Sequence, residues 1–267
     1  MAVVGVGPAM IVESGPMSGH SKWSQIKRQK GANDAKRGAA FTKVAREIAI
    51  AARAGGGDPD ANYRLRIAMD KARAINMPMD NIKRAIERAT GSGEGEQFEE
   101  IVYEGYGPGG VAILVEAATD NRNRTAAEVR AIFTKAGGQL AGAGAVAWQF
   151  EPRGLVTLPR AGQDADEMTL LAIDAGADDV DTDGQETIDV YTTPHDLEAV
   201  RKSLEVAGVK VDGAEITMQA RNTVEVDPGH ARQNLRLIEQ LEDQDDVQRV
   251  TANFEIPDEV FAEAASA

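Results

Sequence analysis

The sequence predicts an α+β protein with a helical N-terminal domain and two ferredoxin-like (split βαβ) domains, one inserted in the other. Three observations lead to this fold class. Apolar residues recur at helical spacing between residues 41 and 89. After residue 97 the pattern changes to alternating strands and helices. Between residues 155 and 219 the elements run β, α, β, β, α, β, which is one complete split βαβ unit.

The N-terminal helices are predicted from apolar stripes. The first stripe has one apolar residue per turn: Phe41, Val44, Ile48 and Ala52. A break at AGGGDPDAN (54–62) precedes a second stripe that begins at Leu65, and Pro78 suits the first turn of a third helix. The segment Ser18–Gly38 has only Trp23 and Ile26 as large apolar side chains, so we expect it to become ordered only on a partner.

The remaining elements are predicted from glycine-rich turns and amphipathic patterns. Strands at 101–104 and 111–116 flank the turn GYGPGG (105–110). A helix is expected from about Thr125 to Ala136, with Thr125 and Glu128 as a capping box. Further elements outside the 155–219 unit are a strand at 146–150, a strand at 224–226, a helix at 228–242 and a strand at 247–254.

The insertion follows from how these pieces combine. Residues 111–150 and 222–254 are each a βαβ, and together they would complete a second unit around the first. A continuous two-domain arrangement would leave two half-sheets with open edges, so we favour the insertion. The predicted boundaries are an unstructured leader at 1–16, a basic helical domain at 17–95, an α+β domain at 98–152 with 221–258, and an inserted α+β domain at 153–220.

Composition limits the chemistry. The chain has no cysteine, which excludes disulfides, thiolate metal sites and cysteine nucleophiles and fits a reducing compartment. Its histidines lie far apart, outside any metal-binding spacing. We therefore predict no metal, no cofactor and no small-molecule substrate. No apolar run is long enough to span a membrane, so no membrane partner is expected, and the sequence leaves the oligomeric state open.

Charge is divided unevenly along the chain. Residues 20–95 hold 16 Lys and Arg against 8 Asp and Glu, a net charge of +8, whereas the whole chain carries −14 and the rest of it −22. A basic segment in an acidic protein attracts polyanions and releases their counterions, while the acidic part repels them. The distribution favours nucleic acid as the partner, against the alternative of a solvated helical surface.

The predicted nucleic-acid contacts lie at the front of the basic region. They are its cations, one histidine and one tryptophan: His20, Lys22, Trp23, Lys27, Arg28, Lys30, Lys36, Arg37, Lys43 and Arg46. An exposed Trp23 could stack on a base with Lys22 on phosphate. It could equally anchor the segment to its own helical bundle, and the sequence leaves both interpretations open.

A second contact is predicted at TDNRNRT (119–125). Arg122 and Arg124 stand at a helix N-terminus, where the macrodipole disfavours cations, so we expect them to face an anion or carboxylates such as Asp120 and Glu128. The sequence leaves open whether this is a contact for RNA or protein or a structural polar corner with Asp and Asn as turn formers. An enzyme that uses Asp120, Arg122 and Arg124 is less favoured, because no nucleophile stands beside a base. The acids of QLEDQDDV (240–247) are expected to form a solvated helix end and turn.

Eight sequence blocks, in order, resemble the YebC/PmpR family. They are GHSKW, DAKRG, FTK with REI, GGGDP, NMPMDNI, YEGYGPGGVA, TDNRNRTAAEVR and LEDQDDVQRV, and the resemblance runs from about Met17 to Val260. It implies a helical domain followed by two α+β domains. It also implies a cytoplasmic, non-enzymatic protein, described in the family as a DNA-binding transcriptional regulator, with relatives linked to ribosomes or to mitochondrial translation. The family offers no agreed functional site to transfer.

The function predicted from the residues and the resemblance together is a cytoplasmic, non-enzymatic regulator of gene expression. It would bind DNA through the basic helical domain, as a probable transcriptional regulator. The alternative is a translation factor that contacts ribosomal RNA within the ribosome.

Overall fold

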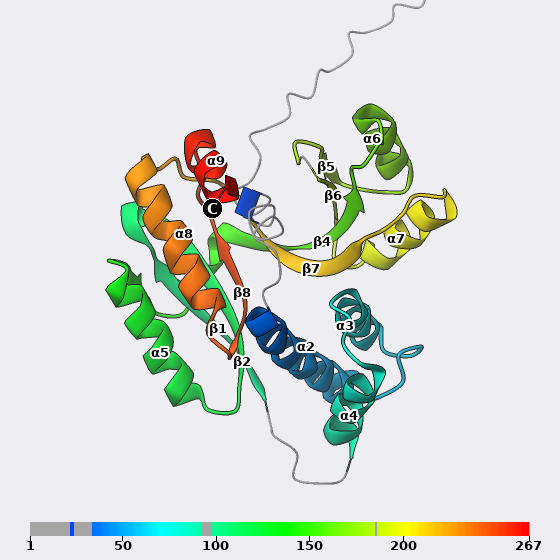
Figure 1. Cartoon of the computed structure of the whole chain (residues 1–267), viewed down its shortest axis with the longest axis horizontal. Helices are drawn as coiled ribbons and strands as arrows, with labels where there is room; N and C mark the ends of the chain where they lie inside the picture. Colours follow the sequence, from blue (N-terminus) through cyan, green and yellow to red (C-terminus); the bar gives the residue numbers. More distant parts are fainter. Residues whose placement is uncertain (1–21, 24–33, 92–97, 185, 267) are drawn as a thin grey trace, which may run out of the picture.

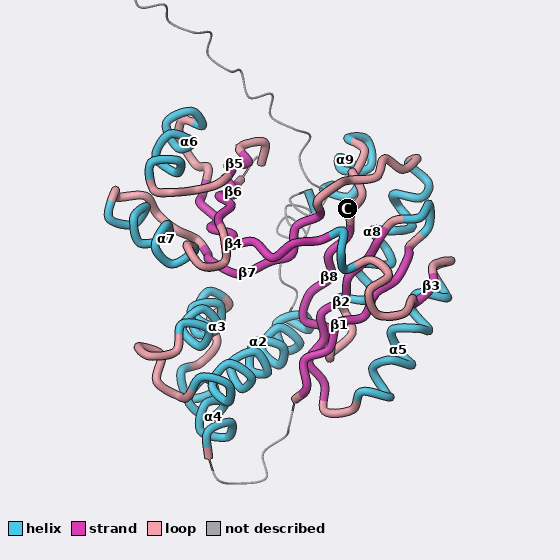
Figure 2. The backbone as a smooth tube through the Cα atoms, turned by 180° about the vertical axis from the view of Figure 1, so that it is seen from behind, coloured by secondary structure: helices cyan, strands magenta, loops and turns pink. Residues whose placement is uncertain are grey.

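The computed structural model describes residues 22–23, 34–91, 98–184 and 186–266. It confirms the predicted fold class, since a helical region precedes two four-stranded antiparallel sheets. Figures 1 and 2 show three bodies around a common centre. We call them the helical domain (34–91), the outer domain (98–149 with 221–266) and the inserted domain (150–220). The predicted leader at 1–16 lies outside the described residues.

The helical domain consists of α2 (Asp34–Gly55), α3 (Tyr63–Ala74) and α4 (Met79–Thr90). Its core is formed by the predicted stripes, with Ile48 and Leu65 fully buried and Ile82 added from α4. Asn62 begins α3, because its side-chain oxygen accepts a hydrogen bond from the amide of Leu65 at 3.0 Å. The same side chain donates to the carbonyl of Ala51 at 2.8 Å, which ties the loop to α2.

The outer domain has a sheet of strand order β3-β1-β2-β8. Its strands are β1 (Glu99–Tyr106), β2 (Ala112–Thr119), β3 (Gln139–Leu140) and β8 (Val247–Ala252). Helices α5 (Arg122–Lys135) and α8 (Pro228–Glu242) cover one face, where Ile113 and Val115 meet Phe133, Leu237 and Ile238 in the main core. The C-terminal helix α9 (Asp258–Ser266) adds Val260 to this core.

The inserted domain is the predicted split βαβ unit. Its elements are β4 (Phe150–Pro159), α6 (Ala165–Asp174), β5 (Asp179–Asp181), β6 (Thr187–Thr192), α7 (Leu197–Val206) and β7 (Gly213–Ala220). The strand order is β5-β6-β4-β7, with every neighbouring pair antiparallel. Leu158 and Ile188 of the sheet pack with Ala172 of α6 and Leu204 of α7. Both crossover helices therefore shield one core.

Three details of the outer domain differ from the prediction. The expected strand at 146–150 is a short 3-10 turn (Ala147–Gln149), and β4 begins at Phe150 and continues through the predicted boundary at 152/153 into the inserted domain. The expected strand at 224–226 is reduced to one parallel bridge between Val224 and Phe254. The sheet instead takes β1 as an inner strand, next to β2. The glycine-rich turn between β1 and β2 is confirmed, with left-handed Gly109 in it.

The start of α5 also differs from the prediction. The helix begins three residues earlier than expected, at Arg122, and Asn121 rather than Thr125 caps it by accepting from the amide of Arg124. The side chain of Thr125 is buried and bonded to other partners. A threonine followed three residues later by glutamate looks the same in sequence whether it caps a helix or lies inside its first turn.

The helical domain contacts both α+β domains. From α3, Tyr63 and Ile67 pack against the core of the inserted domain, and Arg66 pairs with Glu198 of α7 at 3.3 Å. From α2, side chains reach the end of α8 and the turn before β8. Figure 1 shows α2 running from the outer domain toward α3 and α4.

Candidate nucleic-acid interface

The structure describes the side chains of four of the ten predicted contact residues. His20, Lys27, Arg28 and Lys30 lie outside the described residues. Lys36 and Arg37 fall in the first part of α2, and their side chains are likewise outside the description. The four described side chains, Lys22, Trp23, Lys43 and Arg46, all contact the outer domain.

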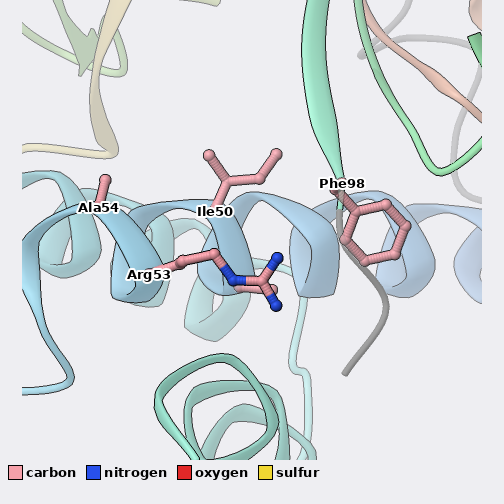
Figure 3. A pocket seen from close by; sticks show the side chains of 5 residues that line it. Ile50, Arg53, Ala54 and Phe98 are labelled. Atoms are coloured by element: carbon pink, nitrogen blue, oxygen red, sulfur yellow. The ribbon is translucent and has the colours of Figure 1, made fainter. Parts of the chain in front are cut away.

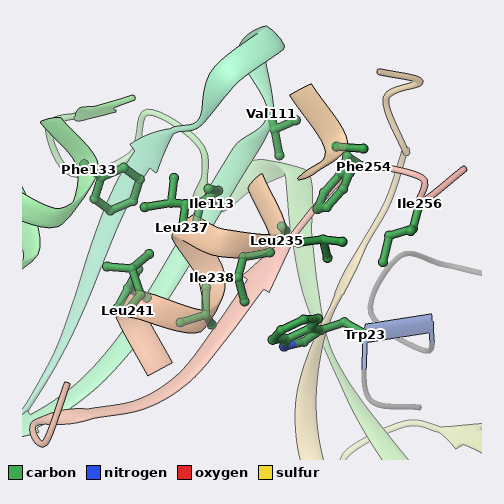
Figure 4. Packing of buried hydrophobic residues seen from close by; sticks show 14 of the residues in the cluster. Trp23, Val111, Ile113, Phe133, Leu235, Leu237, Ile238, Leu241, Phe254 and Ile256 are labelled. Atoms are coloured by element: carbon green, nitrogen blue, oxygen red, sulfur yellow. The ribbon is translucent and has the colours of Figure 1, made fainter. Parts of the chain in front are cut away.

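Trp23 is buried in the core of the outer domain. Its side chain is 7% exposed and belongs to the cluster that contains Leu235, Ile238 and Ile256 (Figure 4). The indole nitrogen donates to Oε2 of Glu242 at 3.3 Å. A ring in this position cannot stack on a base. Trp23 anchors its segment, as the second interpretation expected, but the anchor is the outer domain and not the helical bundle.

Lys22 is bound beside it. Its Nζ donates to the carbonyl of Ile256 at 2.9 Å and pairs with Asp258 at the start of α9 at 2.8 Å. The Lys22 charge lowers the pKa of Asp258, first through the hydrogen bond and then through its field. Lys22 and Trp23 are therefore both attached to the C-terminal part of the outer domain.

Lys43 and Arg46 extend the same junction along α2. Lys43 donates to the carbonyl of Glu242 at the end of α8, a position that favours cations. Arg46 pairs with Asp246 at 2.9 Å and its guanidinium lies 5.2 Å from the ring centre of Phe98. Phe98, Ile50, Arg53 and Ala54 line a small cavity of about 190 Å³ beside it (Figure 3).

Asp246 is the centre of this junction. The residue is 1% exposed, and its carboxylate accepts hydrogen bonds from Thr125 at 2.7 Å, Arg124 at 2.8 Å and Thr119 at 3.1 Å. Burial is the largest single influence on its pKa and raises it. The hydrogen bonds and the charge of Arg46 outweigh burial, so the pKa of Asp246 is lowered. We call Arg46, Thr119, Arg124, Thr125 and Asp246 the Asp246 network.

The prediction that the acids of 240–247 form a solvated turn is therefore wrong for Asp246. The carboxylate of Asp246 pairs with Arg46 of α2, and Gln244 closes the turn by accepting from the amide of Asp246 at 2.6 Å. Three of the sequence blocks noted above, those containing Arg46, Arg124 and Asp246, meet at this one place. The sequence shows each block separately and gives no sign that they are in contact.

The arginines of the second predicted contact have different surroundings. Arg124 pairs with Asp120 and with Asp246, each at 2.8 Å, so it faces carboxylates, one of the two expectations. Arg122 is exposed and lies 3.8 Å from Glu99.

Among the described residues no group of three or more His, Cys, Asp or Glu side chains is arranged to hold a metal ion. Nor does any described helix have the length and apolar character needed to cross a bilayer.

Exposed cations without partners are found instead on α4. Lys83, Arg84 and Arg88 are exposed, and none of them makes an ion pair or side-chain hydrogen bond with the described residues. Other cations of the helical domain are paired, such as Arg64 with Glu100 and Lys71 with Glu47. The prediction did not single out α4, although its strict separation of apolar and charged positions is visible in the sequence.

The exposed tryptophan of the described residues is Trp148, which the prediction placed in a strand. It is 68% exposed. Its loop is held by the buried carboxylate of Glu104, which accepts from the amides of Gly144, Val146 and Ala147 at 2.6–2.8 Å. Burial is the largest influence on the pKa of Glu104 and raises it, but these backbone hydrogen bonds lower it overall. Trp148 is thus presented by a well-bonded loop.

Comparison with known proteins covers most of the chain. Residues 21–92 match the model of the TACO1/YebC protein N-terminal domain, and residues 98–254 match that of the TACO1/YebC second and third domain. A protein of Moorella thermoacetica named "probable transcriptional regulatory protein" is 55% identical over 90% of this chain and 96% of its own length. A Roseiflexus castenholzii protein of the same name is 56% identical over 94% of this chain and 100% of its own length.

A solved structure agrees with the fold. The crystal structure of a conserved hypothetical protein from Aquifex aeolicus superposes with a TM-score of 0.80 at 48% identity, covering 84% of this chain and 92% of the other. The matched models span all three domains in order, and the relatives match over nearly their whole length. The chain belongs to the TACO1/YebC family.

Proposed function

We propose that the protein is a non-enzymatic, cytoplasmic regulator of gene expression that binds DNA through its helical domain. The names of its relatives support a role in transcription. The excess of positive charge in residues 20–95 supports a polyanionic partner. The described contacts support two different uses of this charge. Lys22, Lys43 and Arg46 hold the domains together, and the exposed cations of α4 remain available for the partner.

The observation that carries the proposal is the arginine pair of α4. Arg84 and Arg88 are one helical turn apart, both exposed, and neither has a carboxylate partner among the described residues. Like charges at this spacing destabilise a helix by about 0.2–0.5 kcal/mol. Their cost is offset when an anion binds between them, and arginine is the side chain best shaped to hold phosphate.

The connection between α3 and α4 favours duplex DNA. Four residues, 75–78, join the two helices, and Asn76 has a left-handed backbone with φ of 58°. Helix-turn-helix units use a turn of this length and place the second helix in the major groove. Asn81, Arg84 and Arg88 share one edge of α4, and asparagine and arginine are the side chains that most often read adenine and guanine.

The test compares DNA affinity of the wild-type chain with that of the double variant Arg84→Ala/Arg88→Ala. Fluorescence anisotropy with a labelled 30-bp duplex is measured over a range of salt concentrations. Each lost phosphate contact should reduce the salt slope of log K by about 0.9 for duplex DNA. The matched control is Lys202→Ala/Lys210→Ala, which removes the same charge from two exposed lysines of the inserted domain.

The proposal expects weakened binding with the α4 variant and unchanged binding with the control. Equal losses in both would show that only total charge matters, and no loss in either would move the interface away from α4. The translation alternative uses the same cations on ribosomal RNA. A structured ribosomal RNA fragment that binds much more tightly than duplex DNA, and depends on Arg84 and Arg88, would favour that alternative.

The absence of catalysis is also part of the proposal. Asp120 and Arg124 are bound to each other, and Arg124 is held by Asp246 as well. An acid and a base engaged in this way lack the free geometry that general acid–base chemistry requires. Arg122 is exposed and paired only at 3.8 Å with the exposed Glu99, an ion pair that a phosphate could replace, and we keep it as a second contact on the outer domain.

A further inference from the structure

A cleft opens where the three domains meet. It has a volume of about 550 Å³ and is bounded by α2 and α3, by β7, and by the face of the outer sheet that α5 and α8 do not cover. In Figure 1 these elements surround the centre of the molecule. Sites for small ligands typically have this size and lie preferentially at domain interfaces.

The cations in the cleft are already paired. Arg64 pairs with Glu100, and Arg249 pairs with Glu215. Lys71 lies 3.0 Å from Glu47 and 3.8 Å from Glu215. No cation of the described residues is therefore left in the cleft to attract an anionic ligand.

One carboxylate of the cleft is not paired. No described cation lies within ion-pair distance of Glu116, and its Oε2 is buried without a hydrogen-bond partner. Its cross-strand neighbours are Val102 on β1 and Arg249 on β8, and the guanidinium of Arg249 is bound to Glu215. Glu116 as a whole is half-buried, but a carboxylate oxygen buried without a partner costs free energy, which a ligand carrying a positive charge would recover.

The walls beside Glu116 are apolar and partly open. Val102 is 52% exposed and Ile216 is 41% exposed, although both lie between domains. Ile50 and Ile67 line the opposite side, from α2 and α3. The hydroxyl of Tyr63 and the Nε2 of Gln248 in the same lining are also buried without hydrogen bonds. The cleft thus offers an unpaired carboxylate, apolar surface and two further polar atoms.

We propose that this cleft binds a small organic cation, an ammonium or guanidinium group on an apolar stem, with the cationic group at Glu116. The apolar stem of the ligand would cover the side chains of Val102 and Ile216 and bury their exposed apolar surface. A nucleotide or another anion does not fit, because the cleft has no unpaired cation among the described residues. A multivalent metal does not fit either, since the described carboxylates form no cluster of three ligands.

Proton binding should compete with this ligand. Burial is the main cause that raises the pKa of Glu116, and the nearby charges of Glu215 and Glu100 raise it further, against Arg249 and Lys71. The other groups that face it from the surrounding helices are Glu47, Tyr63 and Arg64. Because the cation needs ionised Glu116, affinity should rise with pH as this carboxyl loses its proton.

The experiment is a calorimetric titration of the full-length protein with n-butylguanidinium, and with n-butylurea as the uncharged probe of the same shape. The proposal expects saturable one-site binding of the cation and none of the urea. Glu116→Gln should weaken the cation about tenfold or more, as the loss of a charged hydrogen bond does, and should abolish the pH dependence. Glu87→Gln on the exposed face of α4 is the matched control and should bind like wild type.

A second variant keeps the proposal testable if Glu116→Gln folds poorly. Val102→Lys places an ammonium group directly across the strands from Glu116, so it should block the ligand while leaving Glu116 in place. Three results would overturn the proposal. They are no binding of the cation by wild type, equal binding by Glu116→Gln, and binding of n-butylurea as tight as that of n-butylguanidinium.

Discussion

The inner face of α2 and the outer face of α4 carry the same kind of charge in different surroundings. On α2, Arg46 meets the buried carboxylate of Asp246, and Lys43 meets the end of α8. On α4, Arg84 and Arg88 face solvent without a partner among the described residues. The first face positions the domains and the second is available for a partner. A count of basic residues cannot separate these two uses, because only the neighbours of each side chain distinguish them.

The contact between Trp23 and the outer domain should be sensitive to shortening of the side chain. Trp23→Ala removes a buried indole from the outer core, and we expect a loss of about 3 kcal/mol in the free energy of unfolding. Urea unfolding followed by circular dichroism measures it. Trp148→Ala is the control, since this ring is 68% exposed and its removal should cost little. Similar losses for both rings would contradict the burial of Trp23.

The next largest effect is expected at the centre of the junction. Asp246→Asn keeps the shape but removes the charge that Arg46 and Arg124 share, so we expect a loss of about 2 kcal/mol. Amide exchange should also rise on the inner face of α2. Asp243→Asn, at the exposed end of α8, is a matched control that should be close to neutral. A variant of Asp246 that unfolds like wild type would show that the network does not hold the domains.

The contribution of Asp246 should disappear in acid. Its pKa is lower in the folded chain than the unfolded value of about 3.9, so its stabilisation is complete above that value and is lost as pH falls through the folded pKa. The difference in unfolding free energy between wild type and Asp246→Asn should be constant from about pH 5 upward and shrink below about pH 4. A difference that grows in acid would have the wrong sign for this network.

The outer face of α4 should show the smallest effect on stability, and in the opposite direction. Arg84→Ala/Arg88→Ala removes two like charges one turn apart and introduces good helix formers, so the melting temperature should stay the same or rise slightly. Differential scanning calorimetry of the variant without nucleic acid measures this. A clear decrease in melting temperature would mean that these arginines have structural partners, and α4 would then resemble α2.

The inserted domain could be predicted because each of its elements is local. Its strands and helices alternate in short segments with turns between them, and its chain order alone fixes the split βαβ topology. The outer domain was harder, because β4 crosses from one domain to the next and the apolar residues before it form a turn. Periodicity marks where apolar residues lie and not which sheet they join.

The candidate site was less predictable than the fold. Trp23 stands among polar residues and Trp148 in the mostly apolar stretch AVAWQF, yet Trp23 is buried against Leu235 and Ile238 and Trp148 is exposed. Asp246 sits in a run of acids that looks solvated, and it is buried because residues more than 100 positions away supply its hydrogen bonds. Contacts over such distances depend on the assembled domains, so local pattern does not reveal them.

The contrast between the two tryptophans gives the molecule two distinct optical reporters. Trp23 is enclosed beside Glu242, so its emission should be blue-shifted and protected from iodide, whereas the ring of Trp148 is open to collisional quenchers. Replacing Trp148 with phenylalanine would leave Trp23 as the single tryptophan, packed in the core of the outer domain. The emission of Trp23 would then report, in real time, whether its contact with the outer domain persists while the protein binds a partner.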